Sequence, residues 1–162
     1  NRTCRPDLPP QRKLELGDLN LLLCHGSPRK VNEFLWESTT PTHFLNALVE
    51  DAQVDVIAAT HTGIKWKRRL ADGRMFVNVG VLGRPENDGQ TNVWYSLLEI
   101  TSQAGAAKAH IDFIPVEYDH QRLAREMQSE RLPKEFVETV ATGWWTTCLE
   151  VLPVKERRRG KY

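Results

Sequence analysis

The sequence predicts an α/β fold. An apolar run at residues 21–24 is followed by an amphipathic segment after Pro41 and by a second apolar run at residues 54–60. A strand, a helix and a strand in this order are what a parallel crossover requires. Beyond residue 63 the pattern changes to short strands broken by turns, which indicates an antiparallel or mixed second half.

The length and composition indicate one ordinary globular domain. A chain of 162 residues can bury a substantial core, and 40% hydrophobic with 27% charged residues is typical of soluble domains. We therefore expect a single domain over residues 1–162, with an irregular lead-in at 1–12 and a basic tail at 153–162. No basic face stands out elsewhere in the chain, so we expect no nucleic-acid partner.

The cysteines and the apolar runs bear on location. Cys4, Cys24 and Cys148 are odd in number and widely spaced, which favours a reducing compartment over a disulfide framework. No apolar run reaches the 18 residues of a membrane span, so we predict a cytoplasmic protein without a membrane partner. The chain does not begin with Met, which suggests that something upstream is missing.

In the first half, alternation in period two on both sides of residues 17–18 predicts a β-hairpin with a two-residue turn. A short helical turn is expected at residues 31–36. Thr40 and Pro41 then offer an N-cap and a first helical position for an amphipathic helix. Its apolar face would carry Phe44, Leu45, Leu48 and Val49.

In the second half, strands are expected at residues 75–79, 92–100 and 110–117, with a turn at 104–106 between the last two. Asp119 can cap a helix, and Pro133 can open another that Gly143 closes. We expect Trp144 and Trp145 to be packing anchors.

Each of the two apolar runs of the first half ends at a histidine, His25 and His61 respectively. The carboxyl ends of parallel strands meet at one edge of an open sheet, where such folds bind ligands. Two imidazoles from distant positions in the sequence can therefore reach one metal ion. We predict that His25 and His61 are metal ligands.

Three motifs, in the same order and spacing, resemble those of the calcineurin-like metallophosphoesterases. The chain is similar in particular to the C-terminal half of a bacterial phosphoprotein or dinucleoside-polyphosphate phosphatase. His25-Gly26 resembles the isolated histidine motif of the family, and Thr-His-Thr-Gly at residues 60–63 resembles its Gly-His-x-His motif. The segment at residues 77–85 resembles its Asn-x-Gly-Ser-x-Gly-x-Pro turn. The resemblance covers roughly residues 13–143.

The resemblance implies a β-sandwich of two mixed sheets flanked by helices, in four layers of order α/β/β/α. It also implies two divalent metal ions (Mn, Fe, Zn or Mg) at the strand ends and a phosphate-ester substrate. Arg29, Asn78 and Arg84 accompany the motifs and are candidates for binding that substrate. For the two arginines the alternative is solvated surface charge, and for Asn78 it is a role in locking its turn.

The chain departs from the family pattern in two ways. The Asp-x-His, Gly-Asp-x-x-Asp and Gly-Asn-His-Asp/Glu motifs, which supply carboxylates and the catalytic histidine in the family, are absent. The chain therefore reads as the C-terminal half of the fold, and the missing N-terminal half is expected as its partner. Gly63 occupies the place of the last histidine, so the second metal lacks a ligand.

The sequence thus predicts a metal-dependent phosphoesterase whose site is completed by residues absent from this chain. The alternative is a non-catalytic interaction domain that keeps the fold, and an oligomer is possible with either. A cysteine-phosphatase loop is not expected. Cys24 and Arg29 form Cys-x4-Arg, one residue short of the required spacing, and Pro28 removes an amide donor from the loop.

Overall fold

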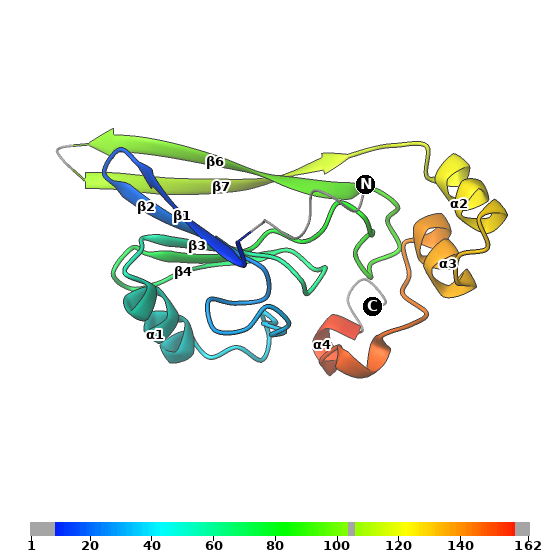
Figure 1. The fold of residues 1–162 in the computed structure, drawn as a ribbon, viewed down its shortest axis with the longest axis horizontal. Coiled ribbons are helices and arrows are strands. Elements are labelled where there is room, and N and C mark those ends of the chain that lie inside the picture. Colours follow the sequence, from blue (N-terminus) through cyan, green and yellow to red (C-terminus); the bar gives the residue numbers. More distant parts are fainter. Residues whose placement is uncertain (1–8, 104–105, 158–162) are drawn as a thin grey trace.

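The computed structural model of the protein describes residues 9–103 and 106–157 (Figure 1). A five-stranded sheet lies between helix α1 on one face and a long two-stranded antiparallel ribbon on the other. Helices α2 and α3 lie beyond one end of the ribbon. The helices are α1 (Thr42–Ala52), α2 (His120–Ser129), α3 (Lys134–Thr142) and α4 (Val154–Arg157), with a 3-10 turn at Leu149–Val151.

The five-stranded sheet is mixed, with strand order β1-β2-β3-β5-β4. The three inner strands are parallel, and the two edge strands run antiparallel to their neighbours. The strands are β1 (Gln11–Leu16), β2 (Leu19–Cys24), β3 (Val56–Ala59), β4 (Trp66–Arg69) and β5 (Met75–Asn78), and the ribbon consists of β6 (Val93–Gln103) and β7 (Ala106–Val116).

The predicted hairpin and crossover are both confirmed. Strands β1 and β2 pair across the turn at Gly17, whose φ of +64° is readily adopted by glycine. Strand β2, helix α1 and the parallel strand β3 follow in order. Strand β1 begins at Gln11, so the irregular lead-in was predicted two residues too long. Residues 1–8 of that lead-in lie outside the described part of the chain.

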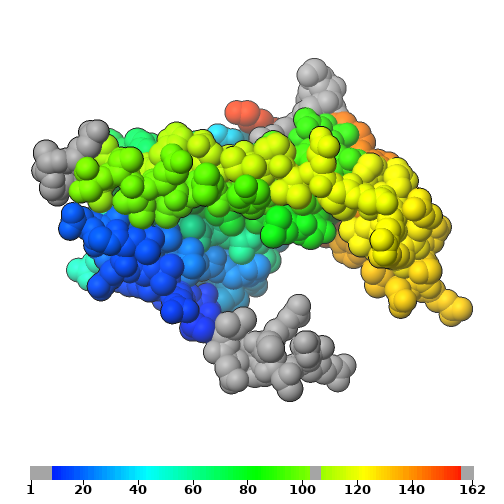
Figure 2. Space-filling view, turned by 90° about the horizontal axis from the view of Figure 1, so that it is seen from above, coloured from blue at the N-terminus to red at the C-terminus, as the bar shows by residue number. Residues whose placement is uncertain are grey.

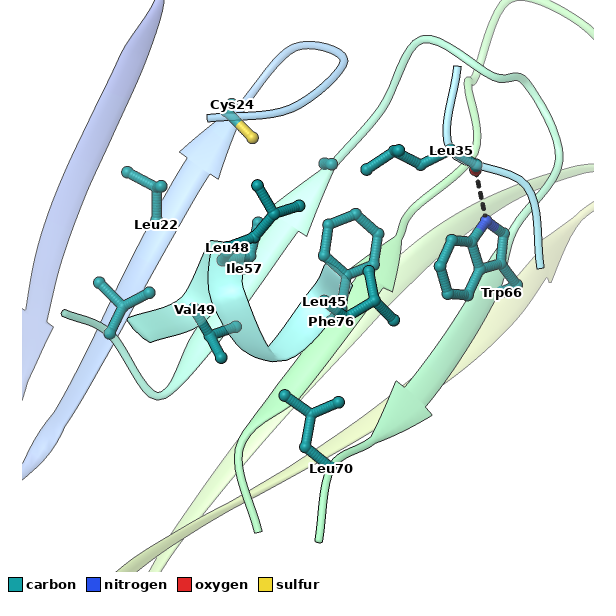
Figure 3. Packing of buried hydrophobic residues seen from close by; sticks show 12 residues of the cluster. Leu22, Cys24, Leu35, Leu45, Leu48, Val49, Ile57, Trp66, Leu70 and Phe76 are labelled. Carbon is teal, nitrogen blue, oxygen red and sulfur yellow. Dashed lines mark hydrogen bonds between the residues drawn. The ribbon is translucent and has the colours of Figure 1, made fainter. Parts of the chain in front are cut away.

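The segment before α1 differs from expectation. Residues 31–36 contain a turn at 31–32 and then backbone without regular secondary structure, not a helical turn. The carbonyl of Leu35 accepts a hydrogen bond of 2.9 Å from the indole nitrogen of Trp66, which ties this segment to the sheet (Figure 3). Pro41, with an extended backbone, is the N-cap of α1, one position later than predicted.

The first core lies between α1 and the sheet. Leu45, Leu48 and Val49 of the helix are almost fully buried and face the buried side chains of Ile57 and Phe76 (Figure 3). The ring of Phe76 stacks on that of Trp66 at 5.0 Å between centroids. Burial of these apolar side chains contributes most of the free energy that holds α1 against the sheet.

The second core lies between the other face of the sheet and the ribbon. Leu21, Val56 and Val77 point to this face and are buried together with Ala109 and Ile111 of β7. The opposite face of the ribbon carries the exposed side chains of Tyr95 and Leu97. Figure 2 shows this face as an elongated ridge that runs along the molecule.

The strands of the second half agree with the prediction, apart from β4. Strands β5, β6 and β7 lie where they were expected, and β7 already begins at Ala106. The other two residues of the predicted 104–106 turn fall outside the described residues. Strand β4 was not predicted, because three of its four residues are basic. It is an edge strand whose Trp66 points into the core while Lys67 and Arg69 are exposed.

The C-terminal helices are close to prediction. The Asp119 side chain caps α2 by accepting a hydrogen bond of 2.8 Å from the backbone N–H of Arg122, and Gly143 ends α3 at a φ of +73°. Residues 154–157 of the predicted tail form a helix whose Glu156 is buried and accepts a hydrogen bond of 2.9 Å from the N–H of Ser38. Residues 158–162 lie outside the described part.

The predicted α/β class is confirmed. Helix α1, the five-stranded sheet and the ribbon form three successive layers, and the helices that follow the ribbon lie at its end (Figure 1). Within the described residues, none of the helices combines the length and the apolar character needed to cross a bilayer. The cytoplasmic location stays a prediction.

The first core yields a stability prediction. Phe76→Ala is expected to lower the free energy of unfolding by about 3–5 kcal/mol, because the cavity left beside Trp66 cannot fully collapse. Leu82→Ala, at a side chain that is 64% exposed, is the control and should change it by less than about 0.5 kcal/mol. Urea denaturation measures both. Similar losses in the two variants would contradict this account of the core.

Candidate metal centre

Three neighbouring parallel strands end in one row. Cys24 of β2 pairs with Ala59 of β3, which pairs with Asn78 of β5. The residues that follow these strands therefore meet at one edge of the sheet, where α/β folds bind their ligands.

The structure brings the two predicted metal ligands together at this edge. His25 Nε2 lies 2.9 Å from His61 Nδ1, and the rings meet edge to face with centroids 4.8 Å apart. The 2.9 Å distance is that of a hydrogen bond between the two rings. Two nitrogens that bind a tetrahedral ion at about 2.1 Å lie about 3.4 Å apart, so the rings would have to separate by about 0.5 Å and release the proton between them to share one ion.

The backbone of His61 has an uncommon conformation. Its φ is +83°, a region in which a side chain costs about 1–2 kcal/mol relative to the right-handed conformation. The ring packs against Phe34 with centroids 4.5 Å apart. Burial, and to a lesser extent the charge of His25, lowers the pKa of His61. The lowered pKa favours the neutral form of His61, the form that binds a metal.

The loop after His25 requires glycine at the next position. Gly26 has a φ of +74°, and a Cβ there would lie 2.5 Å from the backbone oxygen of Lys30. The N–H of Ser27 donates to the same oxygen at 2.9 Å. The His-Gly pair in the sequence thus reflects a strand end followed at once by a tight turn.

Asn78 holds the strand ends in place. Its side chain is fully buried, its amide nitrogen donates to the Thr60 carbonyl at 3.2 Å, and its amide oxygen accepts from the Gly80 N–H at 3.1 Å. The hydroxyl of Thr60 in turn donates to the Gly80 carbonyl at 2.5 Å. These bonds support the turn-locking role for Asn78, since both ends of its amide are directed at backbone.

The two candidate arginines have different surroundings. Arg29 pairs with Glu33 at 3.1 Å and lies 4.9 Å from the centroid of the Phe44 ring, so its contacts lead toward α1. Arg84 lies 3.7 Å from the centroid of Trp145 and donates to the Thr147 carbonyl at 3.3 Å. Burial lowers the pKa of Arg84. Substrate binding by either arginine stays a prediction.

The indole of Trp145 lies against Gly63, the residue that stands where the family motif has its last histidine. A Cβ added at Gly63 would lie 3.0 Å from the Trp145 indole, and Gly63 has a φ of +77°. Trp145 is itself buried, and its indole nitrogen donates to the Pro85 carbonyl at 2.8 Å. A side chain at position 63 would therefore be in tight contact with the indole, in a backbone conformation that favours glycine.

The donors gathered at this edge are two imidazoles. Over residues 9–103 and 106–157, no cluster of three or more His, Cys, Asp or Glu side chains has the geometry to hold a metal ion. The imidazole pair alone is too small a ligand set, because a catalytic zinc usually has three protein ligands. Metal binding by His25 and His61 stays a prediction.

Cys24 is not a nucleophile in this structure. It is buried, and burial raises the pKa of its thiol to about 11. A thiol must lose its proton to attack a phosphorus atom, so this value agrees with the rejection of a cysteine-phosphatase loop.

Two aromatic residues at the site were not assigned to it from the sequence. Phe34 packs on His61 from a segment predicted to be helical, and Trp145 was expected to pack but not to fill the place of a ligand. Trp145 is 82 positions from Gly63 in the sequence, and no local pattern signals such a contact.

Comparison with known proteins gives a consistent picture of the fold. No protein-family model matches the sequence, and no curated protein matches it. The solved hypothetical protein PH1004 from Pyrococcus horikoshii OT3 is similar at a TM-score of 0.65 and 18% identity, over 86% of this chain and 53% of that one. A metallophosphoesterase from Sphaerobacter thermophilus is similar at a TM-score of 0.58 and 21% identity, over 85% of this chain and 60% of that one.

At these identities the likeness shows the fold alone. The chain has a mixed α/β fold of the metallophosphoesterase type, with a central sheet flanked by helices. It spans between 53% and 60% of the length of the two solved chains.

The contact between Gly63 and Trp145 can be tested by substitution. Gly63→Ala is expected to lower the free energy of unfolding by about 1–3 kcal/mol more than Gly17→Ala does. Both glycines have a positive φ, but nothing lies within 4 Å of a Cβ at position 17. The difference between the variants in urea denaturation therefore isolates the clash with the indole. Equal losses would show that the indole does not restrict position 63.

Proposed function

We propose that this chain is part of a metal-dependent phosphoesterase, in which His25 and His61 bind one divalent ion. The observation that carries the proposal is the 2.9 Å separation of their ring nitrogens at the carboxyl edge of the sheet. The likeness of the fold to a solved metallophosphoesterase supports it.

The two histidines have distinct parts in the proposal. His61 supplies a neutral imidazole whose position is fixed by the contact with Phe34 and by the backbone conformation. The side chain of His25 is exposed and can turn toward an ion. The lowered pKa of His61 favours the neutral ring, whose lone pair can bind an ion. A divalent ion in such a centre supplies Lewis acidity, which polarises a phosphate ester and makes water more acidic.

The proposal includes one ion where the family resemblance implies two. The indole of Trp145 lies where position 63 would direct a second ligand. Imidazole ligands suit zinc, iron, copper and nickel ions better than magnesium, which prefers oxygen donors. Among Mn, Fe, Zn and Mg, magnesium is therefore the least suited to this pair.

The remaining ligands would come from the N-terminal half of the fold, which we propose as the partner of this chain. An open hollow of about 370 Å³ lies beside His25 and is lined by Leu23, Ala58 and Val79. Leu23 continues the buried row of Leu19 and Leu21 but is 39% exposed, so the ribbon does not cover this end of the sheet. A further segment placed here would bury Leu23 and bring its side chains next to His25.

A non-catalytic interaction domain with the same fold is the second candidate. The packing of Trp145 against Gly63 favours it, because a fold that binds no second ion is free to fill that place with an apolar side chain. The uncovered ribbon face with Tyr95 and Leu97 offers an apolar surface for a protein partner.

Metal titration tests the histidine pair directly. Zn²⁺ is expected to bind the chain, and His25→Ala or His61→Ala should weaken binding by about tenfold or more, since losing a ligand costs at least as much as losing an outer-shell contact. His43→Ala, at an exposed position of α1, is the matched control and should bind as the wild type does. Isothermal titration calorimetry above neutral pH measures all four proteins. Equal affinities would remove the pair from any metal site.

Hydrolysis of an aryl phosphate with Mn²⁺ separates the two candidate functions. The assay is made on the chain together with the N-terminal half of the fold, because the proposal places the remaining ligands there. Activity that His25→Ala abolishes is the expected result for the phosphoesterase, and activity that survives this substitution unchanged would exclude His25 from the site. Absence of both metal binding and hydrolysis in the presence of that half would support the interaction domain.

A further inference from the structure

A second pocket lies beside His61 and is separate from the hollow next to His25. It has a volume of about 230 Å³ and shares no lining residue with that hollow. Phe34, Val81 and Trp145 supply apolar parts of its wall. Pockets for drug-sized ligands measure about 300–1,000 Å³, so this one suits a compact molecule of about one ring.

Buried polar atoms without partners concentrate in the lining of this pocket. Within residues 9–103 and 106–157, four buried side-chain nitrogen or oxygen atoms lack a hydrogen bond, and three of them belong to residues that line it. These are His61 Nε2, Thr62 Oγ1 and Arg84 Nε. Thr62 as a whole is almost fully buried, with an exposed fraction of 2%. Buried polar atoms are nearly always bonded in folded proteins, so the lining indicates a polar group that belongs there.

The chemistry of the three atoms indicates an acceptor. Arg84 Nε always carries a proton, and the Thr62 hydroxyl can donate. When His61 Nδ1 directs its lone pair at His25 or at an ion, His61 Nε2 carries the ring proton and donates as well. Arg84 and Thr62 thus supply two donors, and His61 supplies a third in the tautomer with its proton on Nε2; such a lining favours a group with several acceptor oxygens.

Charge and packing narrow the class of ligand further. The guanidinium of Arg84 is held over the Trp145 indole at 3.7 Å and is partly desolvated, so it presents a fixed positive charge. Glu150 also lines the pocket, but its side chain is exposed to solvent. The aromatic surfaces of Trp145 and Phe34 suit a flat apolar portion of the ligand.

We propose that this pocket binds a small organic anion, an oxyanion attached to a compact apolar ring. The oxyanion accepts hydrogen bonds from Arg84, Thr62 and His61, and the ring packs against Trp145 and Phe34. A phosphoryl group and a carboxylate both have this chemistry. For a phosphoryl ligand this inference rests on the proposed function and names the class of its substrate, because Arg84 and His61 belong to both; for a carboxylate it goes beyond that function. Binding itself requires neither a metal ion nor hydrolysis.

Cys148 provides a local probe of the pocket. It lines the pocket as a free, partly exposed thiol, whereas Cys24 is buried with a pKa raised to about 11 and serves as the internal control. In the presence of a chelator, phenyl phosphate or benzoate is expected to slow alkylation of Cys148 by iodoacetamide, measured by peptide mass spectrometry. Phenol, which has the ring without the strong oxyanion, should not slow it at the same concentration.

Calorimetry on variants then tests the donors. Thr62→Val and Arg84→Lys are expected to weaken binding of the protecting anion by about fivefold or more, because each removes an unpartnered donor. Arg122→Lys, at a side chain that is 71% exposed on α2, is the matched control and should bind normally. If Thr62→Val does not fold, Val151→Phe fills the pocket from an exposed position and should abolish binding.

Each outcome bears on the proposal. Protection by phenyl phosphate alone assigns a phosphoryl ligand, protection by benzoate alone assigns a carboxylate, and protection by both supports the shared oxyanion chemistry. Equal protection by phenol, absence of protection by either anion, or unchanged affinity in Thr62→Val and Arg84→Lys would overturn it. The chelator keeps these results independent of the metal titration, so failure of one proposal is distinguishable from failure of the other.

Discussion

Backbone hydrogen bonds between the parallel strands β2, β3 and β5 hold Cys24, Ala59 and Asn78 in one row, and every feature of the candidate site depends on that row. The residue after β2 is His25, and His61 follows β3 by two positions. Their rings meet because the strands are adjacent and parallel, although the histidines are 36 positions apart in the sequence. Asn78 fixes the same edge by bonding the backbone after β3 and β5.

His61 connects the two sites that we propose. One ring nitrogen faces His25 at the sheet edge, and the other belongs to the lining of the pocket with Arg84 and Trp145. Trp145 has two effects in this arrangement, because its indole fills the place of a ligand from position 63 and also supports the Arg84 guanidinium. The same indole thus contacts Gly63 and forms part of the pocket wall.

Sequence patterns were informative wherever local physics decides the structure. The β1–β2 hairpin, the amphipathic helix α1 and the caps of α2 and α3 follow from alternation, periodicity and capping residues. The patterns failed where a distant partner decides. Strand β4 carries three basic residues and is a strand because it pairs with β5. Residues 31–36 form no helical turn, and the bond from Trp66 to the carbonyl of Leu35 ties them to the sheet.

For the site, the amino-acid sequence by itself determined which residues follow the strands: two histidines, a glycine where a further ligand would stand, and an asparagine in the turn. Chemistry and order along the chain suffice for that, since strand ends are marked by a change in local composition. Only the tertiary structure decided that the two imidazoles lie 2.9 Å apart, that Asn78 is directed at backbone and that Trp145 lies against Gly63. These are contacts between residues far apart in the sequence, and packing of the whole chain, with no local signal, selects them.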